Sequence, residues 1–306
     1  MDAPPFHQPV LGTELLALVG SANRVVDGTL GDGGHTEIFR ARGATILGLD
    51  RDPKALVRAQ ARLGDDRIQY HLGSTFDPGS LDHIRAFRPD LILLDLGVSS
   101  RQLDDDALGF TFRPGAPLDM RMSGTGPTAA DLLAEASQAE LMSWLSDYGD
   151  EPRARRLATE LVRRRANRPF LVSDDLVNAI RSALGPRSGP AEFARIFQAF
   201  RIAVNDELAG LDEALPQFRD ALTGGGALAV ISYHSGEDRL VKNAFREWSQ
   251  ACICPPIQPL CTCRGRPLGR LLARRPIGAG DEEIRSNPRA RSAKLRVFVR
   301  ADGAAG

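Results

Sequence analysis

The chain has 306 residues, 42% of them hydrophobic, which is enough for two domains or for one large domain with an insertion. Its 39 basic and 39 acidic residues leave no net charge, so the overall charge neither indicates nor excludes a nucleic-acid partner. No apolar run approaches the roughly 18 residues that a membrane span requires, and the N-terminal MDAPPFHQPV lacks the order of a signal peptide. We expect a globular, cytoplasmic protein without a membrane partner.

Basic residues are distributed unevenly along the chain. The stretch from Arg239 to Arg300 contains fourteen Lys and Arg residues against four acidic residues, and a second basic block runs from Arg153 to Arg168. Such blocks form either solvated faces or surfaces for a polyanion. The pattern leaves both interpretations open.

The first hundred residues alternate short apolar runs with helical patterns, which is typical of βαβ units and a parallel sheet. Asp52 and Pro53 predict the N-cap and first turn of a crossover helix between the second and third strands. The expected strands are Arg24–Asp27, Thr45–Asp50, Ile68–Leu72 and Leu91–Leu96, and a sheet pattern returns at Ala227–Tyr233 and Leu295–Arg300.

The intervening segment predicts helices alone. Ser137 with Glu140 forms a capping box, Ser173 and Gly185 bracket another helix, and one apolar stripe from Phe193 to Leu215 predicts a single long helix. We therefore expect an α/β domain made of residues 1–102 and 208–306, with an inserted helical domain of residues 103–207.

A glycine-rich turn follows the first expected strand, in DGTLGDGGH from Asp27 to His35. Glycines at such a turn let a ligand approach the backbone, and Asp50, at the end of the next strand, is suited to bind ribose hydroxyls. The G-x-G-G spacing differs from the G-x-G-x-x-G of dinucleotide-binding folds, in which a pyrophosphate is bound. The pattern therefore favours S-adenosylmethionine, which has no phosphate, over a nicotinamide cofactor.

Two further residues lie on loops at the carboxyl edge of the expected sheet, where open α/β folds bind ligands. His35 either contacts the cofactor or caps the following helix, and Phe76 either forms a wall for adenine or belongs to the core. Their place at this edge favours the cofactor in both cases.

Eight motifs extend this pattern through nearly the whole chain in order: HQPVL at His7, DGTLGDGGHT at Asp27, GLDRDPKAL at Gly48, DLGVSSRQLD at Asp95, PLDMRM at Pro117, FQAFRIAVNDEL at Phe197, HSGEDRLVK at His234 and NPRARSAKLR at Asn287. With them the chain closely resembles the bacterial 16S rRNA cytosine-N4 methyltransferase family, known as RsmH or MraW. One such motif would be weak support, but eight motifs in the same order make a chance similarity very improbable.

The resemblance implies a Rossmann-like S-adenosylmethionine-dependent methyltransferase sheet with an inserted all-helical domain. It also implies a substrate, a cytidine near the ribosomal P site of 16S rRNA, methylated on its exocyclic N4 amine within the small subunit. The cofactor contacts that it implies are Gly33, Gly34, His35, Asp50, Phe76, Asp95 and Gln102.

For catalysis, Asp95 is the first candidate, because a carboxylate beside the cofactor is able to hydrogen-bond the amine and stabilise developing charge. The alternative is that Asp95 only orients the cofactor. Phe110 and Phe112 are expected to cap an unstacked base, with Arg121 on a phosphate or carbonyl, although both rings could instead pack between the domains. His234 and Ser235 are further candidates for contact with the substrate. The alternative for His234 is that it only hydrogen-bonds buried backbone groups.

All four cysteines lie in CICPPIQPLCTC, as Cys252, Cys254, Cys261 and Cys263. Two such close pairs could form a four-thiolate zinc site, but structural zinc sites usually separate each pair by two or more residues, so the C-x-C spacing favours free thiols and no metal. Two other functions stay open beside the RNA methyltransferase: a nicotinamide-dependent oxidoreductase, which the glycine spacing disfavours, and a catalytically silent ribosome-assembly protein.

Overall fold

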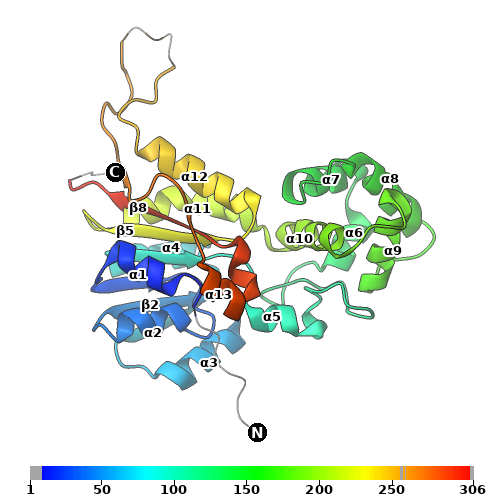
Figure 1. Ribbon diagram of the computed structural model, residues 1–306, viewed down its shortest axis with the longest axis horizontal. Helices are drawn as coiled ribbons and strands as arrows, with labels where there is room; N and C mark the ends of the chain where they lie inside the picture. The colour runs from blue at the N-terminus through cyan, green and yellow to red at the C-terminus, as the bar shows by residue number, and fades with distance from the viewer. Residues whose placement is uncertain (1–8, 256–257, 259, 304–306) are drawn as a thin grey trace. The chain divides into compact units, whose positions relative to one another are not determined.

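The chain folds into two compact units, shown in a computed structural model that describes residues 9–255, 258 and 260–303 (Figure 1). The HQPVL motif begins at His7, outside the described residues. Unit 1 comprises Met1–Gly97 and Ala209–Gly306, and unit 2 comprises Val98–Leu208. The sequence placed these two junctions at Gln102 and Glu207.

The units differ in secondary structure. The strands of unit 1 are β1 (Arg24–Asp27), β2 (Thr45–Asp50), β3 (Ile68–Leu72), β4 (Leu91–Asp95), β5 (Ala227–Ser232), β6 (Gly269–Leu271), β7 (Ile277–Gly278) and β8 (Lys294–Arg300). Its helices are α1 (Gly12–Val19), α2 (Gly34–Arg40), α3 (Pro53–Leu63), α4 (Pro78–Phe87), α11 (Glu207–Ala221), α12 (Ser235–Trp248), α13 (Asp281–Ser286) and η3 (Pro288–Ser292). Unit 2 contains α5 (Ser100–Asp104), η1 (Asp106–Leu108), α6 (Ala129–Glu135), α7 (Gln138–Ser143), η2 (Trp144–Tyr148), α8 (Ala154–Arg165), α9 (Ser173–Leu184) and α10 (Pro190–Asn205).

Unit 1 is built on an eight-stranded, mostly parallel sheet in the order β3-β2-β1-β4-β5-β8-β6, with β7 also paired to β8. The pairs from β3 to β5 are parallel, whereas β8 runs antiparallel to β5, β6 and β7. Strand order reverses between β1 and β4, which in open α/β sheets is the point where ligands bind beyond the carboxyl ends of the strands. The expected Rossmann-like fold with a helical insertion is confirmed.

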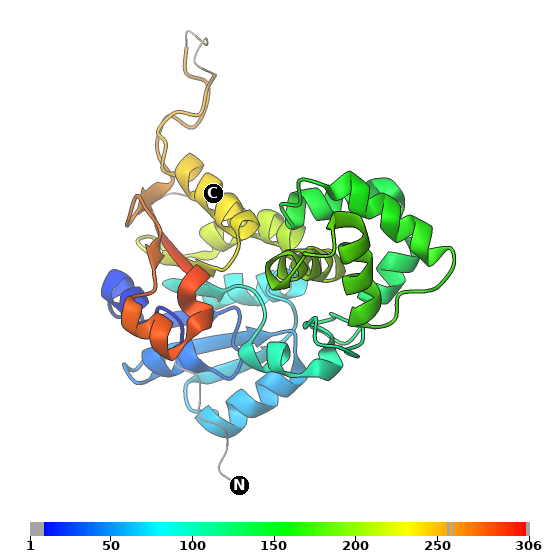
Figure 2. The same cartoon turned by 45° about the vertical axis from the view of Figure 1, so that its right-hand side comes forward.

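Helices cover both faces of this sheet, so its central strands β1, β2, β4 and β5 are buried on both sides. Alternate strand residues such as Leu94 and Val230 pack with α4, α11 and α12, and their neighbours Leu93 and Ala229 pack on the other face with α1, α2 and α3. Figures 1 and 2 show α11 and α12 on the face opposite α1 and α2. In the described part of the chain, no helix has both the length and the apolar character to cross a membrane.

The expected single long helix is wrong, because the chain breaks at Asp206 between α10 and α11. Asp206 adopts a left-handed conformation with φ 50°, which Asp tolerates better than most residues with a side chain. The apolar stripe nevertheless continues on both sides, with Phe200 in the core of unit 2 and Leu211 in the core of unit 1. One uninterrupted pattern therefore serves two separate cores.

Unit 2 contains a fully buried carboxylate between its helices. The Glu151 side chain is 0% exposed and accepts hydrogen bonds from the backbone N–H of Arg153 at 2.9 Å and from Arg195 Nη2 at 3.0 Å. Arg195, on α10, also donates to the carbonyl of Asp150 at 2.9 Å. This network ties α10 to the segment between η2 and α8, and the Glu151 charge depends on it.

We predict that Arg195→Met lowers the free energy of unfolding of unit 2 by about 2–3 kcal/mol, because the buried Glu151 carboxylate loses its main cationic partner. The measurement is urea denaturation followed by circular dichroism. Arg155→Met is the matched control, since Arg155 is an exposed arginine of α8, and we expect it to change stability by less than about 0.5 kcal/mol. Equal effects of the two substitutions would contradict the prediction.

Candidate functional site

Three aspartates lie at the carboxyl ends of neighbouring parallel strands. Asp27 ends β1, Asp50 ends β2 and Asp95 ends β4, and β1 pairs with both of the other strands. Parallel strands end at the same edge of a sheet, so the three carboxyl groups gather where the strand order reverses. This edge is the candidate site of unit 1.

The glycine-rich turn after β1 uses its glycines for different purposes. Added Cβ atoms would lie 2.6 Å from Leu94 at Gly28 and 2.5 Å from Leu63 at Gly33, so both positions allow close packing. Gly33 also has φ 81°, and Gly34, half-buried, begins α2. Gly31 has φ 54° and has no neighbouring atom closer than 4.0 Å to its added Cβ. Gly31, which the sequence analysis did not select, is therefore the glycine that leaves space beside the turn.

Asp50 links this turn to the start of α3. Its Oδ2 accepts the backbone N–H of Gly31 and its Oδ1 that of Asp52, both at 2.8 Å. Burial raises the pKa of the Asp50 carboxyl, and these two hydrogen bonds partly oppose the shift. Each carboxylate oxygen keeps a second acceptor position, so Asp50 is able to bind two hydroxyl groups as well.

His35 and Asp95 form the centre of the site. His35 Nε2 lies 2.9 Å from the carbonyl of Val10, which requires an N–H at that nitrogen, and Nδ1 lies 3.7 Å from Asp95 Oδ2. In the neutral Nε2–H tautomer, Nδ1 would direct a lone pair at the carboxylate. The imidazole and the carboxylate therefore face one another across 3.7 Å at the edge of the sheet.

Tyr233 completes the surroundings of Asp95. Its hydroxyl donates to Asp95 Oδ1 at 2.8 Å, and the backbone N–H of Asp95 donates to Thr29 Oγ1 at 2.6 Å. Burial and the neighbouring Asp95 raise the pKa of Tyr233, which keeps it a proton donor. The Asp95 side chain is still 24% exposed, so this carboxylate borders open space although protein surrounds its other sides.

Acidic groups are concentrated around this pair. Burial raises the pKa of Asp95, and the charges of Asp27 and Glu237 add to the shift, while His35 and the Tyr233 hydroxyl oppose it. Burial also raises the pKa of Asp27, whose Oδ2 accepts the Thr36 hydroxyl at 2.7 Å. A carboxyl group with a raised pKa at the edge of a ligand crevice is typical of functional sites.

Phe76 lies between the site and the core. Its ring centroid is 6.3 Å from that of Phe218, and an added Cβ at Gly210 would lie 3.1 Å from it, so one side of the ring packs against α11. The Arg51 guanidinium lies 6.0 Å from the ring centroid. The preceding residue, Thr75, donates its hydroxyl to the carbonyl of Gly28, which connects this loop to the glycine turn.

His234 and Ser235 begin α12, after β5. His234 Nδ1 accepts the backbone N–H of Glu237 at 3.5 Å, and its buried Nε2 lies 3.2 Å from Glu237 Oε1 without a hydrogen bond to any described residue. Glu237 in turn accepts the backbone N–H of Tyr233 at 2.8 Å. His234 thus serves as a helix cap, one of the two roles considered for it, and Ser235 is exposed at the first turn.

The other expected site residues belong to unit 2. Gln102, on α5, forms a capping box with Ser99, whose N–H donates to Gln102 Oε1 at 2.9 Å. Phe110 is 9% exposed within the core of unit 2, and Phe112 packs edge-on against Phe193 at 5.8 Å between centroids. Arg121 Nε donates to Asp119 at 2.8 Å. The structure thus gives Phe110 and Phe112 a packing role within unit 2.

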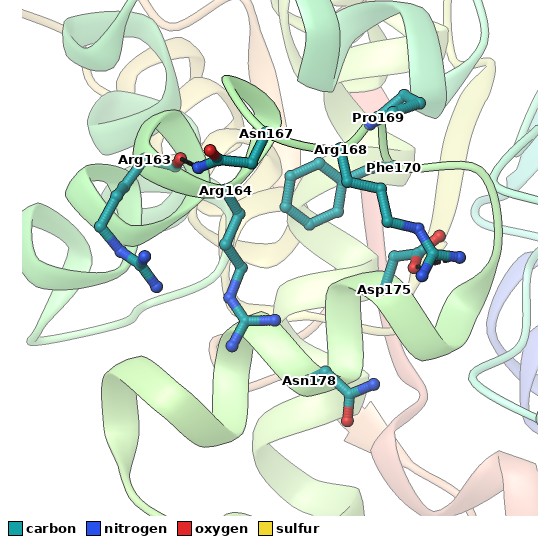
Figure 3. Close-up of a pocket in the computed structure, with 8 residues that line it drawn as sticks. All are labelled: Arg163, Arg164, Asn167, Arg168, Pro169, Phe170, Asp175 and Asn178. Atoms are coloured by element: carbon teal, nitrogen blue, oxygen red, sulfur yellow. Dashed lines mark hydrogen bonds and ion pairs between the residues drawn. The ribbon is translucent and has the colours of Figure 1, made fainter.

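A basic hollow of about 410 Å³ opens on unit 2 within the block from Arg153 to Arg168 (Figure 3). Arg163 and Arg164 both bind Glu160 and lower its pKa to about 2, and Arg168 lies 3.8 Å from Asp175. Its lining residues are Arg163, Arg164, Asn167, Arg168, Pro169, Phe170, Asp175 and Asn178. Three arginines against Glu160 and Asp175 leave an excess of one positive charge around this hollow.

Tyr233 and Glu237 are the main site residues that the sequence analysis missed. Tyr233 ends the apolar run ALAVISY, and its place there is typical of a core residue. Glu237 lies in the first turn of a helix, where acidic residues are common. The available signal was position, because β5 is parallel to β4 and Ile231 pairs with Asp95. Residues just after β5 are therefore expected beside Asp95.

Comparison with known proteins identifies the family. The family model described as the MraW methylase family matches residues 5–301. A ribosomal RNA small subunit methyltransferase H from Gemmatimonas aurantiaca is 55% identical over 298 residues, covering 96% of this chain and 95% of the relative. A protein of the same name from Heliobacterium modesticaldum is 44% identical over 311 residues, covering 95% and 97%.

Among solved structures, an rRNA methylase from Streptococcus thermophilus is 11% identical with a TM-score of 0.43, and the match covers 97% of this chain and 100% of that chain. This likeness is too remote to carry an argument about function. The family match and the identities to the relatives carry it instead, together with the doubly wound sheet and its glycine turn. The chain belongs to the MraW methylase family and is an S-adenosylmethionine-dependent methyltransferase.

Proposed function

We propose that this enzyme methylates the exocyclic N4 amine of a cytidine in the P-site region of 16S rRNA, within the small ribosomal subunit. The observation that carries the proposal is the partly exposed Asp95 carboxylate at the carboxyl edge of the sheet, with a raised pKa and a fixed hydrogen-bond donor on its far side. The relatives named ribosomal RNA small subunit methyltransferase H support the choice of RNA.

We assign cofactor binding to unit 1. Asp50 offers its free acceptor positions to the ribose hydroxyls, the open side of Gly31 admits the ligand close to the backbone, and Phe76 contributes an aromatic wall. When bound, S-adenosylmethionine supplies an electrophilic methyl group on a sulfonium. Gly33, Gly34 and His35 shape the turn, and Gln102 belongs to the same set of proposed cofactor contacts.

We assign to Asp95 the contact with the amine of the substrate. The lone pair of this nitrogen is delocalised into the cytosine ring, so the amine must be held in line with the methyl group and its developing positive charge must be stabilised. The Asp95 carboxylate would accept an N–H of the amine, while Tyr233 fixes the carboxylate from behind. The proton that the methylated nitrogen releases has an acceptor in the His35–Asp95 pair.

Unit 2 is assigned the RNA. The basic hollow offers guanidinium groups to phosphates, which accounts for positioning rather than for base selection. Arg121 and the loop around it, with Phe110 and Phe112, remain the assigned contacts for the unstacked base, and His234 and Ser235 are the assigned contacts from unit 1. Because both rings pack within unit 2, their part in this contact is limited to the surface that Phe112 leaves exposed.

The direct test is transfer of tritiated methyl groups to small subunits that lack this modification, followed by nucleoside mass spectrometry. We expect N4-methylcytidine at one position. Asp50→Ala should weaken donor binding by about 1–3 kcal/mol, because two hydroxyl groups lose their acceptor. Methyl transfer to a carbon atom or to another base would overturn the substrate assignment, and unchanged donor affinity in the Asp50 variant would overturn the cofactor assignment.

The rate of methyl transfer should depend on the ionisation of Asp95. Its pKa is raised, so activity should fall as the pH decreases through a range above that of an ordinary aspartate. Tyr233→Phe removes a hydrogen bond that favours the carboxylate, which raises the pKa of Asp95 further and should shift this acid limb to higher pH. At alkaline pH the variant should approach the wild-type rate.

The control for this measurement is Tyr70→Phe, which removes a hydroxyl that donates to the Gly64 carbonyl away from the site. Its pH–rate profile should match that of the wild type, and Asp95→Asn should be nearly inactive at every pH. An acid limb that does not move in Tyr233→Phe would show that Asp95 does not govern the profile.

The basic hollow should bind the ribosomal particle through phosphates. We expect the double variant Arg163→Glu/Arg168→Glu to bind small subunits at least about tenfold more weakly at low salt, with a salt dependence reduced by roughly one to two in logarithmic slope. Both side chains are largely exposed, at 63% and 78%. Filter binding at several salt concentrations measures the effect.

The matched control reverses Arg42 and Arg88, which precede β2 and β4 and so lie at the sheet edge opposite the carboxyl ends. It should bind particles as the wild type does. The affinity for S-adenosylmethionine should stay unchanged in both double variants. If the two double variants bind particles equally well, the hollow is not an RNA contact.

A further inference from the structure

The four cysteines lie on two arms of one loop between α12 and β6. Cys252 and Cys254 are on the outgoing arm, and Cys261 and Cys263 are on the returning arm. The four Sγ atoms all lie within 4.8 Å of one another. The single residue between the members of each pair predicted free thiols, but the chain reversal brings the two pairs together.

The C-x-C spacing itself favours this meeting. In an extended segment, residues i and i+2 point to the same side, so each arm presents both of its sulfur atoms in one direction. When two such arms run back along one another, the pairs face each other. A spacing of one residue therefore serves the purpose that a longer spacing serves in a tight turn.

The distances between the sulfur atoms fit a single tetrahedral ion. Sγ–Sγ separations are 3.7 Å for Cys252–Cys261, 3.9 Å for Cys254–Cys261, 3.4 Å for Cys261–Cys263 and 3.8 Å for Cys252–Cys263. A zinc–sulfur bond of about 2.3 Å in a tetrahedron places neighbouring sulfur atoms about 3.8 Å apart. A disulfide would need about 2.05 Å. An iron–sulfur cluster would need wider spacing, since each thiolate binds a different iron atom.

The surroundings of the sulfur atoms suit thiolates. The backbone N–H of Ile253 donates to Cys263 Sγ at 3.4 Å. Arg264, directly after the last cysteine, is anchored on α12 by hydrogen bonds to the Glu247 side chain at 3.3 Å and to the Glu247 carbonyl. Four thiolates around a divalent cation carry a net charge of −2, and the N–H donor to Cys263 stabilises part of it.

Apolar packing does not explain why the arms stay together. Ile253 is 44% exposed and Leu260 is 76% exposed. Cys252 and Cys261 are exposed, and Cys254 and Cys263 are only partly buried. Ordering such a loop costs conformational entropy that its few contacts, such as that of Gln258 Nε2 with Thr262 Oγ1 at 2.8 Å, do not offset. A bound ion with four ligands supplies the missing stabilisation.

We propose that these four cysteines bind one Zn²⁺ in a closed tetrathiolate site that ties the two arms of the loop together. Binding releases the four thiol protons to solvent, with no change in oxidation state. All four positions around the ion are protein ligands, so the site is structural and independent of methyl transfer. It would hold Arg264 and the basic residues that follow it in a fixed place beside α12.

The test begins with the metal content of the purified full-length protein, measured by plasma mass spectrometry. We expect about one zinc per chain, retained against a chelator of nanomolar affinity and released by a mercurial that modifies thiols. Replacement by Co²⁺ should give the intense visible absorption of tetrahedral thiolate coordination. Metal-free protein, iron in place of zinc, or an intact mass reduced by the hydrogens of a disulfide would each overturn the proposal.

Variants separate the thiolates from the loop as a whole. Cys261→Ser removes the sulfur that lies within 3.9 Å of each of the other three. It should weaken zinc binding at least about a hundredfold, because loss of a direct ligand costs more affinity than loss of a residue that only hydrogen-bonds a ligand. Ile253→Val keeps every sulfur and the N–H donor in the same loop and should keep full zinc content. Circular dichroism should show both variants folded, because unit 1 has its core elsewhere. Full zinc binding by Cys261→Ser would overturn the assignment.

Discussion

Parallel pairing of β1 with both β2 and β4 is the constraint on which the rest of the enzyme depends. It fixes the carboxyl ends of three strands at one edge and thereby gathers Asp27, Asp50 and Asp95. The helices on both faces of the sheet bury β1, β2 and β4, which explains why the polar residues of these three strands occur only at their ends. The candidate site lies at this edge, where the turn after β1 leaves space beside Gly31.

The gathered carboxyl groups would repel one another if all were ionised. Specific hydrogen-bond donors of the protein, rather than cations from the solvent, stabilise them. Asp50 receives two backbone N–H groups, Asp27 receives the Thr36 hydroxyl, and Asp95 faces His35 and Tyr233. The two roles then diverge. A carboxylate held by one backbone donor on each oxygen is suited to bind hydroxyl groups at its remaining acceptor positions, whereas one that faces an imidazole and a phenol hydroxyl is suited to respond to a changing charge.

Much of this fold follows from the sequence, since short apolar runs mark strand ends closely: β1, β2 and β3 have the predicted bounds, and β4 and β5 end one residue earlier. His35, Asp50 and Asp95 were predictable because each ends or follows such a run. The break at Asp206 was not, because an apolar stripe records burial and not which core buries it. Tyr233 resembled a core residue, Gly31 resembled its neighbouring glycines, and the meeting of the cysteine arms depends on a chain reversal that spacing alone does not encode.

The discontinuity of unit 1 has a consequence for its biosynthesis. β4 ends at Asp95, but its partner β5 begins only at Ala227, after the whole of unit 2 has been synthesised. Unit 2 has its own apolar core and is complete first, while β4 waits with one edge unpaired on the ribosome. A folded insertion reduces the effective length of the loop that β4 and β5 must close. The folded helical unit therefore lowers the entropic cost of pairing β5 with β4.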